Sequence, residues 1–145
     1  MSEAFFPQVQ EPIRYAGLGS TDPLTFKVYD PGRIVLGKRM VDQLRPAVCL
    51  WHSFAAGGSD MFGSGTFDRP WLDSRLEPMV AASGKLDAAF EFLVKLGLPF
   101  FTFHDRDVAS EGATYRETQA NLDRVTGWIE EHMERTGLRL LWGTA

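Results

Sequence analysis

About two-thirds of the way along the chain, residues 98–103 read Leu-Pro-Phe-Phe-Thr-Phe, and residues 104–107, which follow at once, read His-Asp-Arg-Asp. The first run is short, apolar and rich in aromatic side chains, which is typical of a buried β-strand. Pro99 stands at its start, where a missing backbone amide is tolerated. The second run is polar and charged, so we expect the strand to lead into a loop that carries His104 and Asp107.

Two further apolar runs lie on either side of this stretch along the chain. Residues 47–51 read Ala-Val-Cys-Leu-Trp, which predicts a strand buried on both faces. Residues 138–142 read Leu-Arg-Leu-Leu-Trp, which predicts a third strand.

Helical patterns separate the three predicted strands. Apolar residues at helical spacing predict a helix over residues 83–96 that stops at Gly97. A second helix is expected to begin with a capping box formed by Thr114 and Glu117, and to stop at Gly137. Its apolar face carries Leu122, Val125, Ile129 and Met133.

Residues 1–38 predict an irregular N-terminal arm, because prolines and glycines cut them into short pieces. Within and just after the arm, residues 25–29 and 33–36 predict short extended runs, and residues 40–44 predict a turn or two of helix. Residues 39–145 then predict a β-α-β-α-β unit. Strands that alternate with helices indicate an α/β protein with a parallel sheet and right-handed crossovers.

Composition limits the class of protein. The chain has 145 residues, 44% of them hydrophobic and 23% charged, and a net charge of −4, which is ordinary for one globular domain. Its basic residues are scattered, so binding to nucleic acid or to an anionic membrane is not favoured. Cys49 is the one cysteine, which excludes an internal disulfide and suits a reducing compartment. No signal peptide or transmembrane segment is recognisable, so we expect a soluble cytoplasmic protein.

The carboxyl ends of parallel strands carry the functional loops in such sheets. One rim is therefore expected to collect polar and aromatic residues from the three strands: Trp51, His52, His104, Asp107, Trp142 and Thr144. A carboxylate near an imidazole fixes its tautomer and suits it to general acid–base work. The alternative is an ordinary loop histidine surrounded by solvated acids.

Other features leave two interpretations open. Trp51 and Trp142 suit either core packing or the walls of a sugar pocket. His52 is adjacent to Trp51, so on a strand the two would point to opposite faces and His52 would be structural. The glycine-rich residues 57–65 predict either a shaped loop that carries Phe62 outward or a mobile surface loop, and they lack the ending of a phosphate loop. The acids Asp68, Asp105 and Asp107 form no recognisable metal-ligand spacing with the histidines.

Several motifs together carry a resemblance that covers nearly the whole chain. They are Asp22-Pro23-Leu24-Thr25-Phe26-Lys27, Tyr29-Asp30-Pro31, Trp51-His52-Ser53-Phe54, Phe62-Gly63-Ser64-Gly65-Thr66, Asp68-Arg69-Pro70-Trp71, Phe101-Thr102-Phe103-His104-Asp105-Arg106-Asp107 and Leu140-Leu141-Trp142-Gly143-Thr144. With them the chain resembles the N-terminal portion of a bacterial-type xylose isomerase of the longer-armed class. The fold that this implies is the first three β/α units of a TIM (β/α)8 barrel, preceded by the arm.

The resemblance also implies roles for individual residues. His104 is similar to the histidine that contacts the sugar's ring oxygen and assists ring opening, and Asp107 to the acid that holds its imidazole. Trp51, Trp142 and Thr144 resemble residues that contact the sugar. Phe62 resembles a loop phenylalanine that crosses a dimer interface into the neighbouring subunit's site.

The implied activity is an aldose–ketose isomerase that interconverts D-xylose and D-xylulose, and D-glucose and D-fructose. It works by a metal-assisted hydride shift after ring opening, in a homo-oligomer (dimer or tetramer). Family members use two divalent cations, magnesium, manganese or cobalt. Their ligands lie on later strands and have no counterpart before Ala145, so we predict no metal ligand here and a truncated, inactive chain. The alternatives are a non-catalytic, self-assembling α/β fragment, favoured by unpaired sheet edges, and a remnant that only binds sugar.

Overall fold

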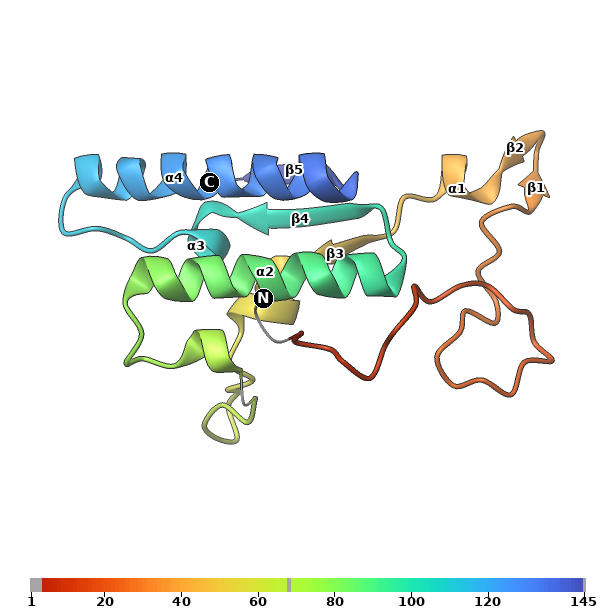
Figure 1. The fold of residues 1–145 in the computed structure, drawn as a ribbon, viewed down its shortest axis with the longest axis horizontal. Coiled ribbons are helices and arrows are strands. Elements are labelled where there is room, and N and C mark those ends of the chain that lie inside the picture. The colour runs from red at the N-terminus through yellow and green to blue at the C-terminus, as the bar shows by residue number, and fades with distance from the viewer. Residues whose placement is uncertain (1–3, 68, 145) are drawn as a thin grey trace.

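The computed structural model describes residues 4–67 and 69–144. Asp68 and Ala145, which the sequence analysis considered, lie outside the described residues. In chain order the elements are β1 (Ile34–Val35), β2 (Lys38–Arg39), α1 (Met40–Gln43), β3 (Ala47–Cys49), η1 (Trp51–Ala55), η2 (Pro70–Leu72), α2 (Pro78–Leu96), β4 (Phe100–His104), α3 (Asp105–Val108), α4 (Tyr115–Thr136) and β5 (Arg139–Thr144) (Figure 1).

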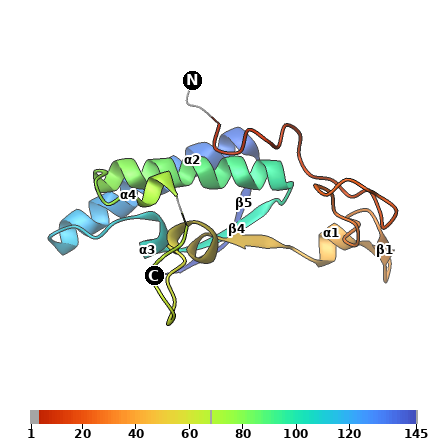
Figure 2. The ribbon, with the colours of Figure 1, turned by 90° about the horizontal axis from the view of Figure 1, so that it is seen from below.

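The three predicted strands form one parallel sheet in the order β3-β4-β5, which confirms the mixed α/β class. Both long helices, α2 and α4, lie on one side of this sheet (Figure 2). Phe101 and Phe103 of β4 join the buried core with residues of α2 and α4. Thr102, between them in sequence, points to the opposite face.

Helix α2 is longer than the sequence pattern predicts. It begins at Pro78, five residues before the predicted start, because the Glu77 carboxylate accepts hydrogen bonds from the Met79 and Val80 amides. Proline is well suited to the first helical position, where no amide is needed. The helix ends where Gly97 adopts a left-handed conformation with φ of 72°, as predicted.

Helix α4 begins at the predicted cap. The Thr114 hydroxyl accepts a bond from the Glu117 amide, and Gly137 ends the helix with φ of 73°. The Glu117 carboxylate reaches one residue further than a capping box requires, to the amide of Ala113. Val125 and Ile129 of the predicted apolar face are buried.

The prediction of a five-residue strand over 47–51 is wrong in two respects. Strand β3 ends at Cys49, and the chain then turns into η1, a π-helical turn over Trp51–Ala55. Only Val48 of the strand is fully buried. A short apolar run does not distinguish a strand from a buried helical turn, and in this segment tertiary contacts favour the helical turn. The carbonyl of Phe54 in η1 accepts a bond from the indole of Trp71, at 2.8 Å.

The first part of the N-terminal arm lies along α2 and is hydrogen-bonded to it. The amides of Phe5 and Phe6 donate to the Glu91 carboxylate at 2.9 and 3.0 Å, and the Ile13 amide donates to the Lys95 carbonyl. Further on, β1 and β2 form a small hairpin and α1 occupies 40–43, close to the predicted helix. Residues 25–29 form no strand; only an isolated bridge joins Phe26 to Tyr15.

Within the described ranges, no helix combines the length and apolar character that crossing a membrane requires.

Candidate functional site

His104 and Asp107 form a hydrogen-bonded pair at the carboxyl end of β4. His104 is the last residue of the strand, and Asp107 lies in the one-turn helix α3 that replaces the expected loop. The Asp107 carboxylate is buried, and its Oδ2 accepts a hydrogen bond from the His104 backbone amide at 2.7 Å. The same oxygen lies 3.0 Å from Nδ1 of the His104 ring. An ionised carboxylate only accepts, so Nδ1 of the ring is the donor in this contact, and in the neutral ring Nε2 is then the acceptor.

Two indole rings stand against this imidazole. The ring of Trp51 meets the His104 ring edge to face at a centroid distance of 5.4 Å, and the ring of Trp142 does so at 5.7 Å. Both tryptophans are about half exposed, so they are not core residues.

The prediction that Trp51 and His52 point to opposite faces is wrong. Their rings stack, with centroids 5.1 Å apart. Alternation holds for a strand, but both residues belong to the π-helical turn η1. His52 therefore lies next to the candidate site.

Strand pairing brings in the last two predicted residues. In the register between β4 and β5, Thr102 pairs with Trp142 and His104 pairs with Thr144. Paired residues share a sheet face, so Trp142 and Thr144 lie on the face that carries His104. The structure thus brings together Trp51, His52, His104, Asp107, Trp142 and Thr144.

Phe62 does not join this group. It lies in the glycine-rich loop and is 88% exposed. In this turn the Asp60 side chain accepts a hydrogen bond from the Phe62 backbone amide. An exposed Phe62 is compatible with both interpretations of this loop. Its role in a neighbouring subunit's site stays a prediction.

Lys85 is a neighbour of the site that sequence reasoning missed. Its Nζ reaches from α2 and donates to the backbone carbonyl of Asp107 at 2.6 Å. Burial lowers the pKa of Lys85, and the charge of Asp107 opposes that effect in part. The sequence did offer one signal, which was the position of Lys85 in the helical pattern. Lys85 borders the buried stripe that includes Ala82, Leu86 and Ala89, so its side chain starts close to the core.

No described residues form a metal centre. Among residues 4–67 and 69–144, no group of three or more His, Cys, Asp or Glu side chains is placed to hold an ion. The residues present therefore do not fit the two-cation site of the resemblance.

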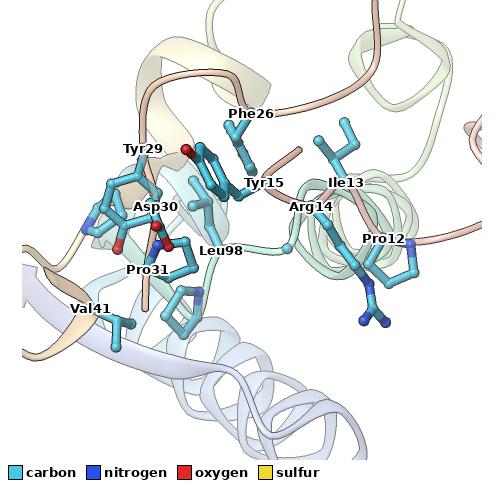
Figure 3. A pocket seen from close by; sticks show the side chains of 13 residues that line it. Pro12, Ile13, Arg14, Tyr15, Phe26, Tyr29, Asp30, Pro31, Val41 and Leu98 are labelled. Carbon is cyan, nitrogen blue, oxygen red and sulfur yellow. The ribbon is translucent and has the colours of Figure 1, made fainter. Parts of the chain in front are cut away.

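A cavity lies at the other end of the sheet. It measures about 530 Å³, and Leu98, which precedes β4, lines it together with arm residues such as Tyr15, Phe26 and Tyr29 (Figure 3). It contains none of the predicted site residues, so it has no part in the chemistry of His104.

The geometry defines a class of protein: a β/α protein in which a histidine, hydrogen-bonded to a carboxylate, lies between two tryptophan rings at the carboxyl ends of parallel strands. Such rings with few polar groups suit a small polyhydroxylated ligand, and the imidazole suits proton transfer to one of its oxygens.

Comparison with known proteins names the family. No family model matches the chain. Curated relatives do: it is 52% identical to the xylose isomerase of Solibacter usitatus (strain Ellin6076) over 147 aligned residues, covering 100% of this chain and 33% of that protein. It is 52% identical to the xylose isomerase of Chelativorans sp. (strain BNC1), again along its whole length, and 50% identical over 97% of its length to that of Pseudomonas fluorescens (strain SBW25). The chain spans about a third of the length of these relatives and is homologous to the N-terminal portion of xylose isomerases.

Proposed function

We propose that the chain carries the ring-opening part of an aldose–ketose isomerase site. The complete enzyme would interconvert D-xylose and D-xylulose, and D-glucose and D-fructose. In this proposal the His104 ring exchanges a proton with an oxygen of the cyclic sugar, and the sugar chain opens before the isomerising step. The observation that carries it is the His104–Asp107 pair between two indoles, in a chain about half identical to xylose isomerases.

Each neighbour has a part in this step. Asp107 holds the proton on Nδ1 and so presents Nε2 to the sugar. Trp51 and Trp142 provide flat apolar surfaces for the carbon face of a sugar, and Thr144 offers a hydroxyl on the same sheet face as His104. We assign Phe62 to a neighbouring subunit's site in a dimer or tetramer of the cytoplasmic enzyme.

The barrel and its cations belong to the complete enzyme in this proposal. The three strands would be the first three of a (β/α)8 barrel. Two divalent cations, magnesium, manganese or cobalt, would be held by ligands outside this chain. The described residues form no such site, so the proposed ring-opening step uses only side chains of this chain.

The activity test uses the purified 145-residue chain. We expect no formation of D-xylulose from D-xylose, with or without magnesium or cobalt, because the chain has the ring-opening residues but no cation site among its described residues. A full-length xylose isomerase assayed in parallel shows that the assay detects turnover. Metal-dependent turnover by the 145-residue chain would contradict the proposal.

A second candidate is a non-catalytic module that assembles with itself. Within the described residues, β3 and β5 are the outer strands of the sheet, and Leu140 and Trp142 of β5 are exposed. Unpaired parallel strands with exposed apolar residues favour association.

A further inference from the structure

Asp107 forms hydrogen bonds through both its side chain and its backbone carbonyl. Its carboxylate is hydrogen-bonded to the backbone amide and the ring of His104, and its backbone carbonyl accepts a hydrogen bond from Nζ of Lys85. The two contacts come from different parts of the fold, since His104 ends β4 and Lys85 lies within α2.

Helix α3 depends on such outside contacts for its orientation. It has one turn, Asp105–Val108, and a single turn does not persist by itself in water. The last carbonyls of a helix also lack partners within it. The Asp107 carbonyl is one of these, and a lysine from a 19-residue helix binds it.

Lys85 is placed to hold this carbonyl with little freedom. Its neighbours on α2, Ala82 and Leu86, are in the buried core, and its own side chain is half-buried. Partial burial removes water from the ammonium group, and the hydrogen bond to the Asp107 carbonyl compensates for this loss. The burial that costs Lys85 hydration also limits the positions its Nζ can take.

We propose that Lys85 is a positioning residue: by fixing the backbone of Asp107 it aims the carboxylate at Nδ1 and so orients the His104 imidazole. Its value for catalysis rests on the proposed isomerase function. The coupling from Lys85 to His104 does not, and it can be measured on the chain without sugar.

Lys95 offers a matched control on the same helix. Its Nζ also donates to a backbone carbonyl, that of Phe6, at 2.5 Å, and it pairs with Glu91 at 2.7 Å. Those contacts hold the arm and not α3. A lysine with a purely stabilising role should behave like Lys95.

The experiment follows the Nδ1 proton of His104 by NMR in the ¹⁵N-labelled chain. Because the proton is hydrogen-bonded to a buried carboxylate, we expect it to exchange with water more slowly in the parent chain than in a free imidazole. We expect Lys85→Met to speed this exchange roughly tenfold, because loss of a charge-assisted hydrogen bond frees the Asp107 backbone. Lys85→Arg should restore slow exchange, and Lys95→Met should leave it unchanged even where it lowers the melting temperature.

Two results would overturn the proposal. One is an unchanged exchange rate in folded Lys85→Met; the other is equal acceleration in Lys85→Met and Lys95→Met, which reports general loosening. If Lys85→Met does not fold, Lys85→Gln replaces it: it keeps a polar side chain but removes the charge, and an exchange rate equal to that of the parent chain contradicts the coupling. No sugar is present, so failure of the isomerase proposal leaves this result standing, and the reverse also holds.

Discussion

A single carboxylate oxygen, Oδ2 of Asp107, accepts both the amide of His104 and its ring proton. Removing this carboxylate leaves the part-buried backbone amide of His104 without its hydrogen-bond acceptor. We therefore expect Asp107→Ala to lower the free energy of unfolding by about 2 kcal/mol, the usual cost of orphaning such a donor. The His104 ring should also lose its preference for the Nδ1–H tautomer. Urea unfolding and ¹⁵N shifts of the imidazole measure the two effects.

Two variants control this experiment. Asp107→Asn keeps an oxygen in the same position, so it should retain most of the stability. Asp105→Ala removes a nearby acid whose carboxylate accepts the adjacent Arg106 amide. Equal losses of stability from Asp107→Ala and Asp105→Ala would contradict the special role of Asp107.

At the level of residues, the sequence predicted the pair but not its surroundings. The three-residue separation of His104 and Asp107 is local, so the chain pattern contains it. The contact of Lys85 with the Asp107 carbonyl joins residues 22 positions apart and depends on how α2 packs beside α3. The stacking of His52 on Trp51 depends on a helical turn that a short apolar run does not reveal.

At the level of elements, α2 and α4 meet around a buried histidine. His132 of α4 stacks on Phe90 of α2 at a centroid distance of 4.5 Å. Its Nδ1 lies 2.7 Å from the Arg135 guanidinium, which can only donate, and its Nε2 lies 3.3 Å from the Asp87 carboxylate. This arrangement fits the neutral ring with its proton on Nε2.

The contact of α2 with α4 should weaken in mild acid. Burial and the charge of Arg135 lower the pKa of His132, and these effects outweigh Asp87 and Glu131, which raise it. A histidine with a lowered folded-state pKa stabilises the fold above its ordinary pKa of about 6.5, and that stability is lost as the pH falls below it. We expect the free energy of unfolding to fall between about pH 7 and pH 5, and His132→Gln to flatten this part of the curve.

The exposed His52 controls the measurement. His52→Gln changes the histidine count equally but leaves the helix contact intact, so its pH curve should follow that of the parent chain. A curve for His132→Gln that keeps the parent's slope would rule out His132 as the source.

The helix ends show why these elements were largely predictable. Gly97 and Gly137 stop helices through a left-handed conformation, which is a property of the residue itself. The start of α2 was missed because the cap by Glu77 and the Pro78 start lie before the apolar stripe becomes regular. Strand β5 runs two residues past its predicted end, to Thr144, because pairing with His104 of β4 extends it.

At the level of the whole molecule, the arm and the sheet edges were the least predictable parts. An irregular segment has no periodicity, so nothing in the sequence of the arm showed that Phe5 and Phe6 bind Glu91 of α2. The sheet edges follow from the strand order. With β4 in the centre, β3 and β5 each have one side without a strand partner among the described residues.

The edge strand β5 leads to the last prediction, that the chain associates in solution. Leu140 and Trp142 leave apolar surface on an edge strand, which is a template for pairing. We expect light scattering after size exclusion to give a mass above the 16.2 kDa of one chain, and Leu140→Lys to shift it toward that value, because edge lysines oppose strand pairing. The control Val28→Lys places the same charge at an arm residue that is 82% exposed and should leave the mass unchanged. A monomer in the parent chain, or equal effects of the two lysines, would remove β5 as the association surface and with it the case for a self-assembling module.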